Sequence, residues 1–275
     1  MDGHMKYLAE EIERAAFEEF HAVAPAELCQ RIGLTGKTIG SAFVSLASAL
    51  PPSAIVINRA IGPGLREAET KRTIDEIVNA YQSAGIDRYF VQVHPAAEPE
   101  TITPWLLERG LAKARGWQKF SRGRERVSPP KTDLSIKEIG PDGESELAVI
   151  LSDAFDLGDA ARPWISLLPT CKHWHVFMTF DGDTPAGTGS VFIDGDCAWM
   201  DFGATAPQFR QRGSQSSLLR HRVQFALDRG CQHMFTCTGE DVPGDPQHSY
   251  TNIMKAGFKE DYVRANYAPP RTLLS

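Results

Sequence analysis

The stretch that decides the fold runs from Cys197 to Gly230 and reads CAWMDFGATAPQFRQRGSQSSLLRHRVQFALDRG. Its first part alternates apolar residues and predicts a strand, which Pro207 ends because proline has no backbone N–H to donate. A short basic loop around Gly213 follows. Beyond it, apolar residues recur at helical spacing, at Leu218, Leu219, Val223, Ala226 and Leu227. The predicted order is therefore strand, basic glycine loop, helix.

This loop is suited to bind an anion. The first turn of a helix has N–H groups with no partner inside the helix, and it carries the positive end of the helix dipole. Arg210 and Arg212 add positive charge, so the sequence predicts a pyrophosphate site here. The alternative is a turn glycine between two solvated arginines, since a short glycine motif carries little information alone.

The longer pattern resembles the acetyl-CoA signature of the GCN5-related N-acetyltransferase (GNAT) family, V-x-P-x-[YF]-R-x-[RK]-G-[IV]-[GA]. The matches lie at Pro207, Phe209, Arg210, Arg212 and Gly213. Two residues depart from the signature: Ser214 replaces an aliphatic residue and Gln215 replaces a small one. These departures predict a helix that begins less tightly around the pyrophosphate.

The flanking segments have the order that the resemblance requires. Predicted hairpin turns at Asp181-Gly-Asp and Asp194-Gly-Asp lead into the strand at Cys197. After the long helix come a strand at 233–237, a short helix over 249–256 and a last strand. The resemblance therefore implies a GNAT-like α+β fold, with a mixed, mostly antiparallel sheet flanked by helices.

The first half of the chain has a similar order of elements but no basic loop. It begins with a predicted amphipathic helix, Tyr7–Ala24, whose apolar stripe excludes Glu10, Glu11, Glu13, Glu18 and Glu19. A buried strand is predicted at Ser53–Arg59. In place of the pyrophosphate loop stands Gly62–Glu69, which is acidic after Arg66, and carboxylates would repel a phosphate.

We therefore expect two GNAT-like units in one chain. Residues 1–130 would form a degenerate domain without a cofactor loop, and residues 131–275 an acetyl-CoA-binding GNAT domain. An unrelated α/β domain is the alternative for the first half.

Composition argues against several classes of protein. The chain has 275 residues and a formal net charge of −6, which disfavours a general nucleic-acid binder because phosphate neutralisation needs clustered Lys and Arg. The scattered cysteines include no C-x-x-C pair and predict reduced thiols. No stretch approaches the roughly 20 apolar residues that span a bilayer. We expect a cytoplasmic protein without nucleic-acid or membrane partners. A homodimer is possible from the sequence.

The resemblance implies an acetyl-CoA-dependent N-acyltransferase of the EC 2.3.1 class, with acetyl-CoA as cosubstrate. The acetyl group would pass to a primary amine of a small molecule or peptide by direct attack in a ternary complex; the identity of the acceptor and a longer acyl group stay open. In the family, a splayed central strand holds the acetyl carbonyl and pantetheine, and the loop holds the pyrophosphate. The residues expected to bind the cofactor are Gly203, Ala204, Thr205, Arg210, Gln211, Arg212, Gly213, Ser214, Gln215, Ser216, Ser249 and Asn252.

The general acid and base do not follow from the signature. The family often places a tyrosine at the position that aligns with Ile253, so the usual acid is missing. Tyr250, one helical turn earlier, is the candidate acid, and Glu240, just past a strand, is the candidate base. Packing of Tyr250 against the sheet and a solvated carboxylate at Glu240 are the alternatives.

The sequence allows three other interpretations. The displaced tyrosine and Gln215 motivate a catalytically silent acyl-CoA-binding or regulatory module. A nucleotide-phosphate enzyme would need a lysine in the glycine loop, which has none. His173 and His175 would point the same way in a strand, but zinc takes about three or four ligands and no third is visible, so no metal site is predicted.

Overall fold

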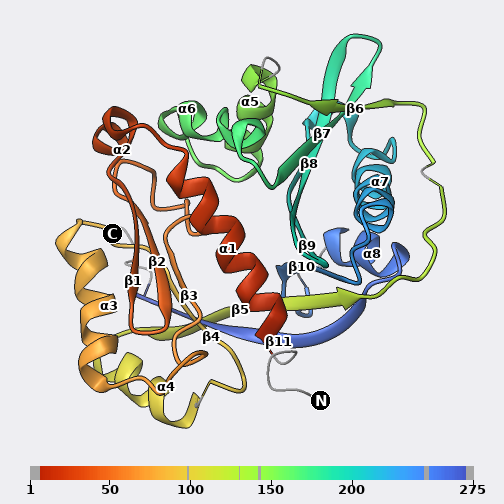
Figure 1. Ribbon diagram of the computed structural model, residues 1–275. Coiled ribbons are helices and arrows are strands. Elements are labelled where there is room, and N and C mark those ends of the chain that lie inside the picture. The colour runs from red at the N-terminus through yellow and green to blue at the C-terminus, as the bar shows by residue number, and fades with distance from the viewer. Residues whose placement is uncertain (1–6, 98, 130, 142–143, 245–247, 271–275) are drawn as a thin grey trace. The chain divides into compact units, whose positions relative to one another are not determined.

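The computed structural model describes residues 7–97, 99–129, 131–141, 144–244 and 248–270 (Figure 1). By compactness the chain divides into two units: unit 1 comprises Met1–Ala24 and Gln118–Asp261, and unit 2 comprises Pro25–Trp117 and Tyr262–Ser275. This division differs from the predicted one at residues 130 and 131. The N-terminal helix packs on the later part of the chain, and the last strand pairs with a strand of the earlier part.

Unit 1 is built on a mixed sheet. Its strands are neighbours in the order β6 (Ser135–Ile139), β7 (Trp174–Asp181), β8 (Thr184–Asp194), β9 (Cys197–Thr205) and β10 (His233–Gly239). All these neighbours pair antiparallel except β9 and β10, which are parallel. The predicted hairpin turns before and after β8 are present, and Gly182 and Gly195 adopt φ of 60° and 57° there. The predicted α+β fold with a mostly antiparallel sheet is confirmed.

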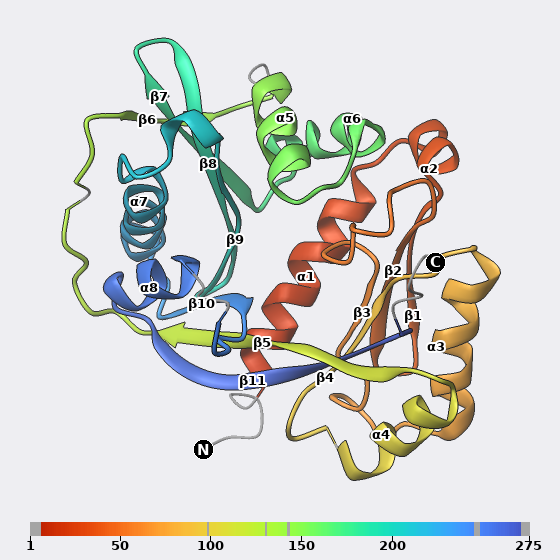
Figure 2. The ribbon, with the colours of Figure 1, turned by 180° about the vertical axis from the view of Figure 1, so that it is seen from behind.

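Helices cover both faces of this sheet (Figure 2). On one face lie α7 (Ser214–Asp228) and α8 (His248–Lys255), and on the other lie α1 (Leu8–Ala22) and α5 (Glu144–Ala154). The single turn α6 (Arg162–Ile165) stacks Trp164 on Phe20 of α1, with ring centroids 4.2 Å apart. Four of the apolar residues predicted to pack α7 are buried in the core: Leu218, Leu219, Val223 and Ala226.

The N-terminal helix forms as predicted, but two of its glutamates are buried. Glu10 and Glu13 are 1% and 0% exposed, and both face Lys119 of β5 (Ala112–Arg122). Nζ of Lys119 lies 3.6 Å from Oε1 of Glu10 and 2.5 Å from Oε2 of Glu13. The apolar stripe could not show this, because the counter-ion that permits burial of the carboxylates is distant in sequence.

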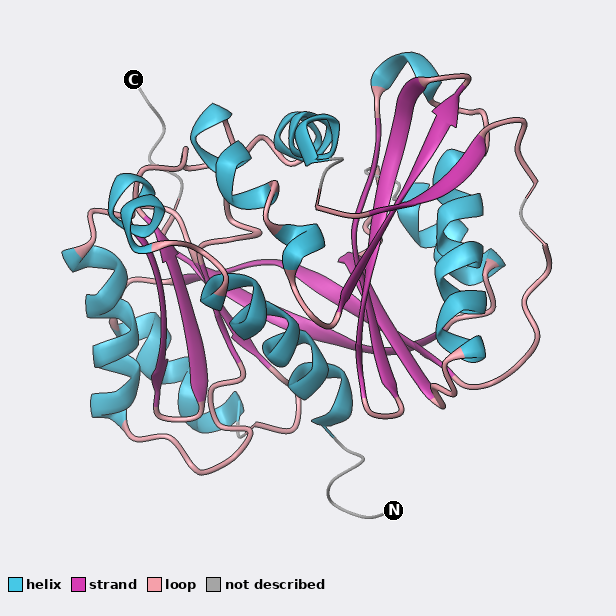
Figure 3. Ribbon diagram, turned by 45° about the horizontal axis from the view of Figure 1, so that its top comes forward, coloured by secondary structure: helices cyan, strands magenta, loops and turns pink. Residues whose placement is uncertain are grey.

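Unit 2 also contains a series of paired strands. Its strands are neighbours in the order β1 (Leu34–Ile39), β2 (Ala42–Ala47), β3 (Arg59–Ile61), β4 (Phe90–Val93) and β11 (Lys259–Ala268), the last entering this unit at Tyr262. Only β3 and β4 pair in parallel. The helices of this unit are α2 (Ala26–Ile32), α3 (Lys71–Ser83) and α4 (Pro99–Glu108) (Figure 3).

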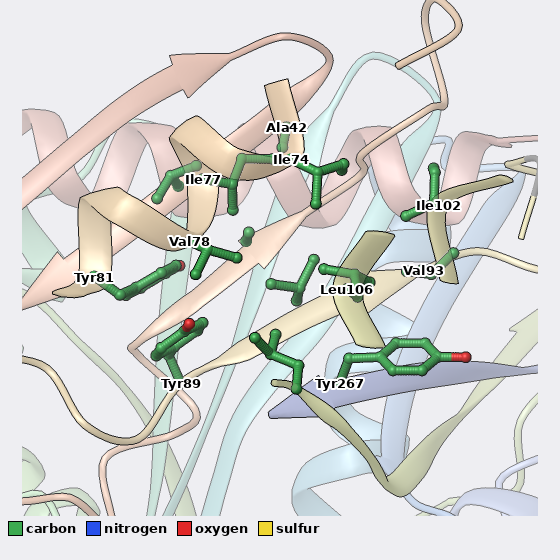
Figure 4. Close-up of a cluster of buried hydrophobic side chains, with 14 of the residues drawn as sticks. Ala42, Ile74, Ile77, Val78, Tyr81, Tyr89, Val93, Ile102, Leu106 and Tyr267 are labelled. Carbon is green, nitrogen blue, oxygen red and sulfur yellow. The ribbon is translucent and has the colours of Figure 1, made fainter. Parts of the chain in front are cut away.

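The core of unit 2 lies between its strands and the helices α3 and α4 (Figure 4). Tyr81 stacks on Tyr89, with ring centroids 4.0 Å apart and planes 6° from parallel. The predicted strand Ser53–Arg59 is wrong: most of it is turn, with the N–H of Ile57 donating to the carbonyl of Ala54, and β3 begins only at Arg59. A short apolar run can be buried in a turn as well as in a strand.

Candidate active site

Unit 1 contains a cavity of about 900 Å³ at the end of β9. Three segments line it: the last residues of β9, the loop and first turn of α7, and the N-terminal part of α8. Every residue predicted to bind the cofactor lines this cavity except Arg212. The lining residues that were not predicted are Ala154, Phe209 and Thr251. Ala154 precedes the lining residues of β9 and of the loop by 49 to 62 positions in the sequence. No local sequence pattern predicts that it lines the cavity.

The cavity opens where β9 and β10 stop pairing. Their paired residues run from Cys197 and His233 to Met200 and Thr236, whereas the strands continue to Thr205 and Gly239. Phe202, two residues after the last pair, has a φ of 50°, which is rare for a residue with a side chain. The splay near Gly203 and Thr205 that the resemblance implied is therefore present.

The start of α7 is open to a ligand. Gly213 has a φ of 80°, and no side chain caps the helix there. A Cβ at Gly213 would lie 2.7 Å from the main-chain oxygen of Lys131, so both the backbone angle and the space require glycine. The first-turn N–H groups, with the helix dipole, favour an anion at this end.

The two arginines of the loop have different roles. Arg212 donates to Asp181, with Nη1 2.7 Å from Oδ2, and also to Asp133. These hydrogen bonds lower the pKa of both carboxyl groups. Arg210 is exposed, lines the cavity, and also lines a smaller hollow of about 360 Å³ beside α5. Within the described residues Arg210 forms no ion pair, so its charge is available to a ligand.

The two residues that depart from the signature tie α7 to the sheet. The hydroxyl oxygens of Ser214 and Thr179 lie 2.7 Å apart. The amide nitrogen of Gln215 donates to the carbonyl oxygens of Ala204 and Thr188, at 2.5 and 3.1 Å. The helix start is thus held to the sheet by polar contacts, and a less tight fit around the pyrophosphate stays a prediction.

The candidate acid and base lie outside the cavity lining. Tyr250 packs edge-on against Phe120, with ring centroids 5.2 Å apart. Its hydroxyl donates to Glu260, and this hydrogen bond raises the pKa of Tyr250 to about 12. Glu240 follows the last residue of β10 directly. Neither residue is brought to the cavity wall, and both catalytic assignments stay predictions.

The two histidines of the metal hypothesis each contact a carboxylate. Nδ1 of His173 lies 2.8 Å from Oε2 of Glu19, and Nδ1 of His175 lies 3.0 Å from Oε1 of Glu138. The described residues contain no cluster of three or more His, Cys, Asp or Glu side chains suited to a metal ion. A helix with the length and apolar composition needed to cross a membrane is also absent from the described part of the chain.

Part of unit 1 is similar in sequence to a known protein family. Residues 147–245 match the family model described as the acetyltransferase (GNAT) family. No sequence among the curated proteins matches the chain.

Several solved structures share the fold. A GCN5-related N-acetyltransferase from Kribbella flavida has a TM-score of 0.62 at 15% identity and covers 92% of this chain and 96% of its own. One from Sphaerobacter thermophilus has a TM-score of 0.58 at 14% identity, with 94% and 91% covered. A tandem GNAT protein from the clavulanic acid biosynthesis pathway has a TM-score of 0.56 at 14% identity, with 94% of each chain covered.

These similarities define an α+β protein with the fold of the GCN5-related N-acetyltransferases over most of its length. The signature around Gly213 lies inside residues 147–245, the part of the chain that is similar to the acetyltransferase (GNAT) family. This similarity supports a transferase of the EC 2.3.1 class.

Proposed function

We propose that the chain transfers an acetyl group from acetyl-CoA to a primary amine of a small molecule or a peptide, by direct attack in a ternary complex. The observation that carries the proposal is the cavity of unit 1, which joins the edge of β9 that no longer pairs with β10 to the N-terminus of α7. The start of α7 suits the diphosphate of acetyl-CoA, and the edge of β9 suits its pantetheine arm and thioester.

The start of α7 suits the diphosphate of CoA. Its first-turn N–H groups have no side-chain cap, and Gly213 allows the main chain the sharp turn that exposes them. Arg210 adds a charge that no described carboxylate neutralises. An anion at a helix N-terminus is stabilised by these donors and by the helix dipole.

The last residues of β9, which pair with β8 but not with β10, suit the pantetheine arm and the thioester. An unpaired strand edge offers main-chain donors and acceptors, which the amides of the arm can satisfy. Ser249 and Asn252 add polar side chains from α8. Donors aimed at the thioester carbonyl would stabilise the negative charge that its oxygen gains during attack.

Proton transfer is the less complete part of the site. The amine must lose a proton to attack, and the leaving thiolate gains one. Tyr250 and Glu240 remain our candidates for acid and base. Because the bond to Glu260 raises the pKa of Tyr250 to about 12, Tyr250 holds its proton at neutral pH. It would have to leave Glu260 to deliver that proton to the thiolate.

A silent acyl-CoA-binding or regulatory module is the second candidate function. It is favoured by one observation, that neither Tyr250 nor Glu240 lines the cavity. Such a module would bind the cosubstrate without turning it over.

The test combines binding with turnover. Calorimetry with CoA and acetyl-CoA would be followed by thiol release over a panel of primary amines. We expect Arg210→Glu to weaken CoA binding by about tenfold or more, since charge-assisted hydrogen bonds are worth about 1.5 to 3 kcal/mol. Arg220→Glu, which changes another arginine of unit 1 whose guanidinium bonds main-chain oxygens of Ser128 and Lys255, is the matched control.

The outcomes separate the two functions. Failure of the unaltered chain to bind CoA would contradict both. Binding without acceptor-dependent thiol release across the panel would favour the silent module. We also propose that only unit 1 binds the cosubstrate; a cytoplasmic location and a homodimer stay predictions from the sequence.

A further inference from the structure

We propose that Arg222 is a positioning residue for acyl transfer, which fixes the bulge of β9 and places a permanent positive charge behind Gly203. The proposal rests on the proposed function, because it assigns a role at the thioester end of the same cavity.

The side chain of Arg222 lies at the point where the pairing of β8 and β9 is interrupted. Thr188 pairs with Ala204 and Ser190 pairs with Asp201, so Gly189 alone faces Phe202 and Gly203. This count of one residue against two defines a β-bulge. Its strain is visible at Phe202, whose φ is 50°.

Arg222 bonds both strands at this bulge. Its Nη1 donates to the carbonyl oxygens of Ser190 at 2.8 Å and Asp201 at 3.0 Å, and its Nε donates to the carbonyl of Leu218 at 3.2 Å. The guanidinium fills the place of a side chain on Gly189, where a Cβ would lie 2.7 Å from Cζ. One cation from α7 therefore holds the two strands where their own ladder is broken.

The third guanidinium nitrogen faces the cavity edge. A Cβ at Gly203 would lie 3.7 Å from Nη2 of Arg222 and 2.7 Å from Oε1 of Gln215. Gly203 itself is exposed and lines the cavity. Within the described residues Nη2 makes no hydrogen bond, although Arg222 is only 3% exposed.

The hydrogen bonds of this buried cation all end on neutral carbonyls, so its burial is costly, and the charge of Asp201 offsets a part of that cost. Burial lowers the pKa of Arg222 to about 10, which still leaves it charged at neutral pH. Core packing alone would be met at lower cost by an apolar side chain. A buried charge beside a cavity is a feature of functional sites.

The charge is placed where attack on a thioester needs it. The tetrahedral intermediate forms as the amine nitrogen bonds to the carbonyl carbon and the carbonyl electron pair moves to oxygen. It collapses as the electron pair on oxygen re-forms the C=O bond and the C–S bond breaks. The nitrogen loses a proton to the base, and the CoA thiolate leaves and takes a proton from the acid. A fixed cation behind the main chain that cradles this oxygen stabilises its negative charge, and a fixed bulge keeps the main-chain donors in place.

The experiment compares Arg222→Met, Arg222→Lys and the surface control Arg220→Met. CoA affinity is measured by calorimetry. Polarisation of the thioester is measured from the infrared carbonyl stretch of bound acetyl-CoA labelled with ¹³C at the carbonyl, and kcat and KM follow once an amine acceptor is found.

We expect Arg222→Met to keep CoA affinity within about twofold, because the diphosphate site at Gly213 is intact. It should lose most of the shift in carbonyl frequency that binding causes in the unaltered chain, and kcat should fall about 10- to 100-fold. Arg222→Lys keeps the charge and should recover part of both. If Arg222→Met does not fold, the carbonyl frequency and kcat of Arg222→Lys test the proposal.

Folded variants with the unaltered carbonyl frequency and kcat would overturn the proposal. A parallel loss of CoA affinity and kcat would also overturn it, since that is what a purely structural role produces. If the unaltered chain bound no CoA, the proposed function itself would fail, and this inference with it.

Discussion

The two units each contain a strand, a loop and a helix in the same order, and the two helices begin differently. In unit 1, β9 leads into α7, whose first turn has no side-chain cap and borders a cavity. In unit 2, β3 leads into α3, and the hydroxyl of Thr70 caps this helix by accepting the N–H of Thr73 at 3.1 Å. One helix start is left for a ligand, and the other is satisfied by its own chain.

Unit 2 also supplies its own anion. Glu69 is 8% exposed, and one of its carboxylate oxygens accepts the N–H groups of Ser41 at 2.8 Å and Gly64 at 3.0 Å. Those donors are therefore engaged by a carboxylate of the same loop. The order of elements alone therefore does not make a binding loop; the identity of a few residues at the helix start does.

The largest effect is expected from Gly213→Glu in unit 1. A side chain there would meet the carbonyl of Lys131, and its carboxylate would stand where the diphosphate is proposed to bind. We expect CoA affinity to fall by at least about 100-fold, more than the tenfold that a lost contact alone would cause. Calorimetry measures the loss.

Gly230→Glu is the matched control for this change. Gly230 follows the opposite end of α7 and has a φ of 85°, close to the 80° of Gly213, but no atom lies within 4 Å of a Cβ built there. Both variants suffer the backbone strain of a left-handed residue. Equal CoA affinities for the two variants would remove the diphosphate from the start of α7.

The second prediction concerns α8 of unit 1, which carries Tyr250, the candidate general acid. If Tyr250 is the general acid, Tyr250→Phe should lower kcat by about 100-fold and leave CoA affinity unchanged, because general acids contribute about 10² to 10⁴ in rate. A kcat equal to that of the unaltered chain would remove Tyr250 from the mechanism.

The raised pKa of Tyr250 predicts that the stability of the protein depends on pH. This pKa is raised from the usual value of 10 to about 12 by the bond to Glu260. The stabilisation is therefore fully present below pH 10 and is lost as the pH rises through 12. Thermal unfolding between these values should show a smaller decline in Glu260→Gln than in the unaltered chain.

The third prediction concerns the internal anion of unit 2. Glu69→Ala leaves two main-chain donors without their acceptor, so the free energy of unfolding should fall by about 2 to 3 kcal/mol. CoA should still bind with one molecule per chain and unchanged affinity, since only unit 1 is proposed to bind it. Denaturant unfolding and calorimetry measure the two quantities.

Glu67→Ala is the control for this variant. Glu67 lies in the same loop, is exposed, and contacts Ser41 through its main chain. It should change neither stability nor affinity. A second CoA molecule bound by Glu69→Ala would show that the carboxylate was blocking a working site.

The sequence predicted the parts of the site that depend on local patterns. The signature from Pro207 to Gly213 located the cavity loop, and helical spacing located α7 and its buried face. It could not predict that Glu10 and Glu13 are buried, because their counter-ion on β5 is far away in the chain. The same holds for Arg222, which looks like any polar residue of α7 until the bulge of β9 is seen beside it.

The smallest effect is expected from Arg212→Ala, which tests whether the two arginines of the basic loop differ in function. Both arginines match the family signature, yet the guanidinium of Arg212 is held by Asp133 and Asp181 at the surface, whereas Arg210 lines the cavity. We expect Arg212→Ala to change CoA affinity by less than about threefold, since exposed ion pairs contribute little. Arg210→Ala should weaken it by about tenfold, as a lost charge-assisted hydrogen bond does. Calorimetry at two salt concentrations would test this, because only the arginine that contacts the diphosphate should alter the salt dependence of binding. A larger loss of CoA affinity in Arg212→Ala than in Arg210→Ala would mean that the loop changes conformation when CoA binds. Arg212 would then leave the two carboxylates and contact the diphosphate in place of Arg210.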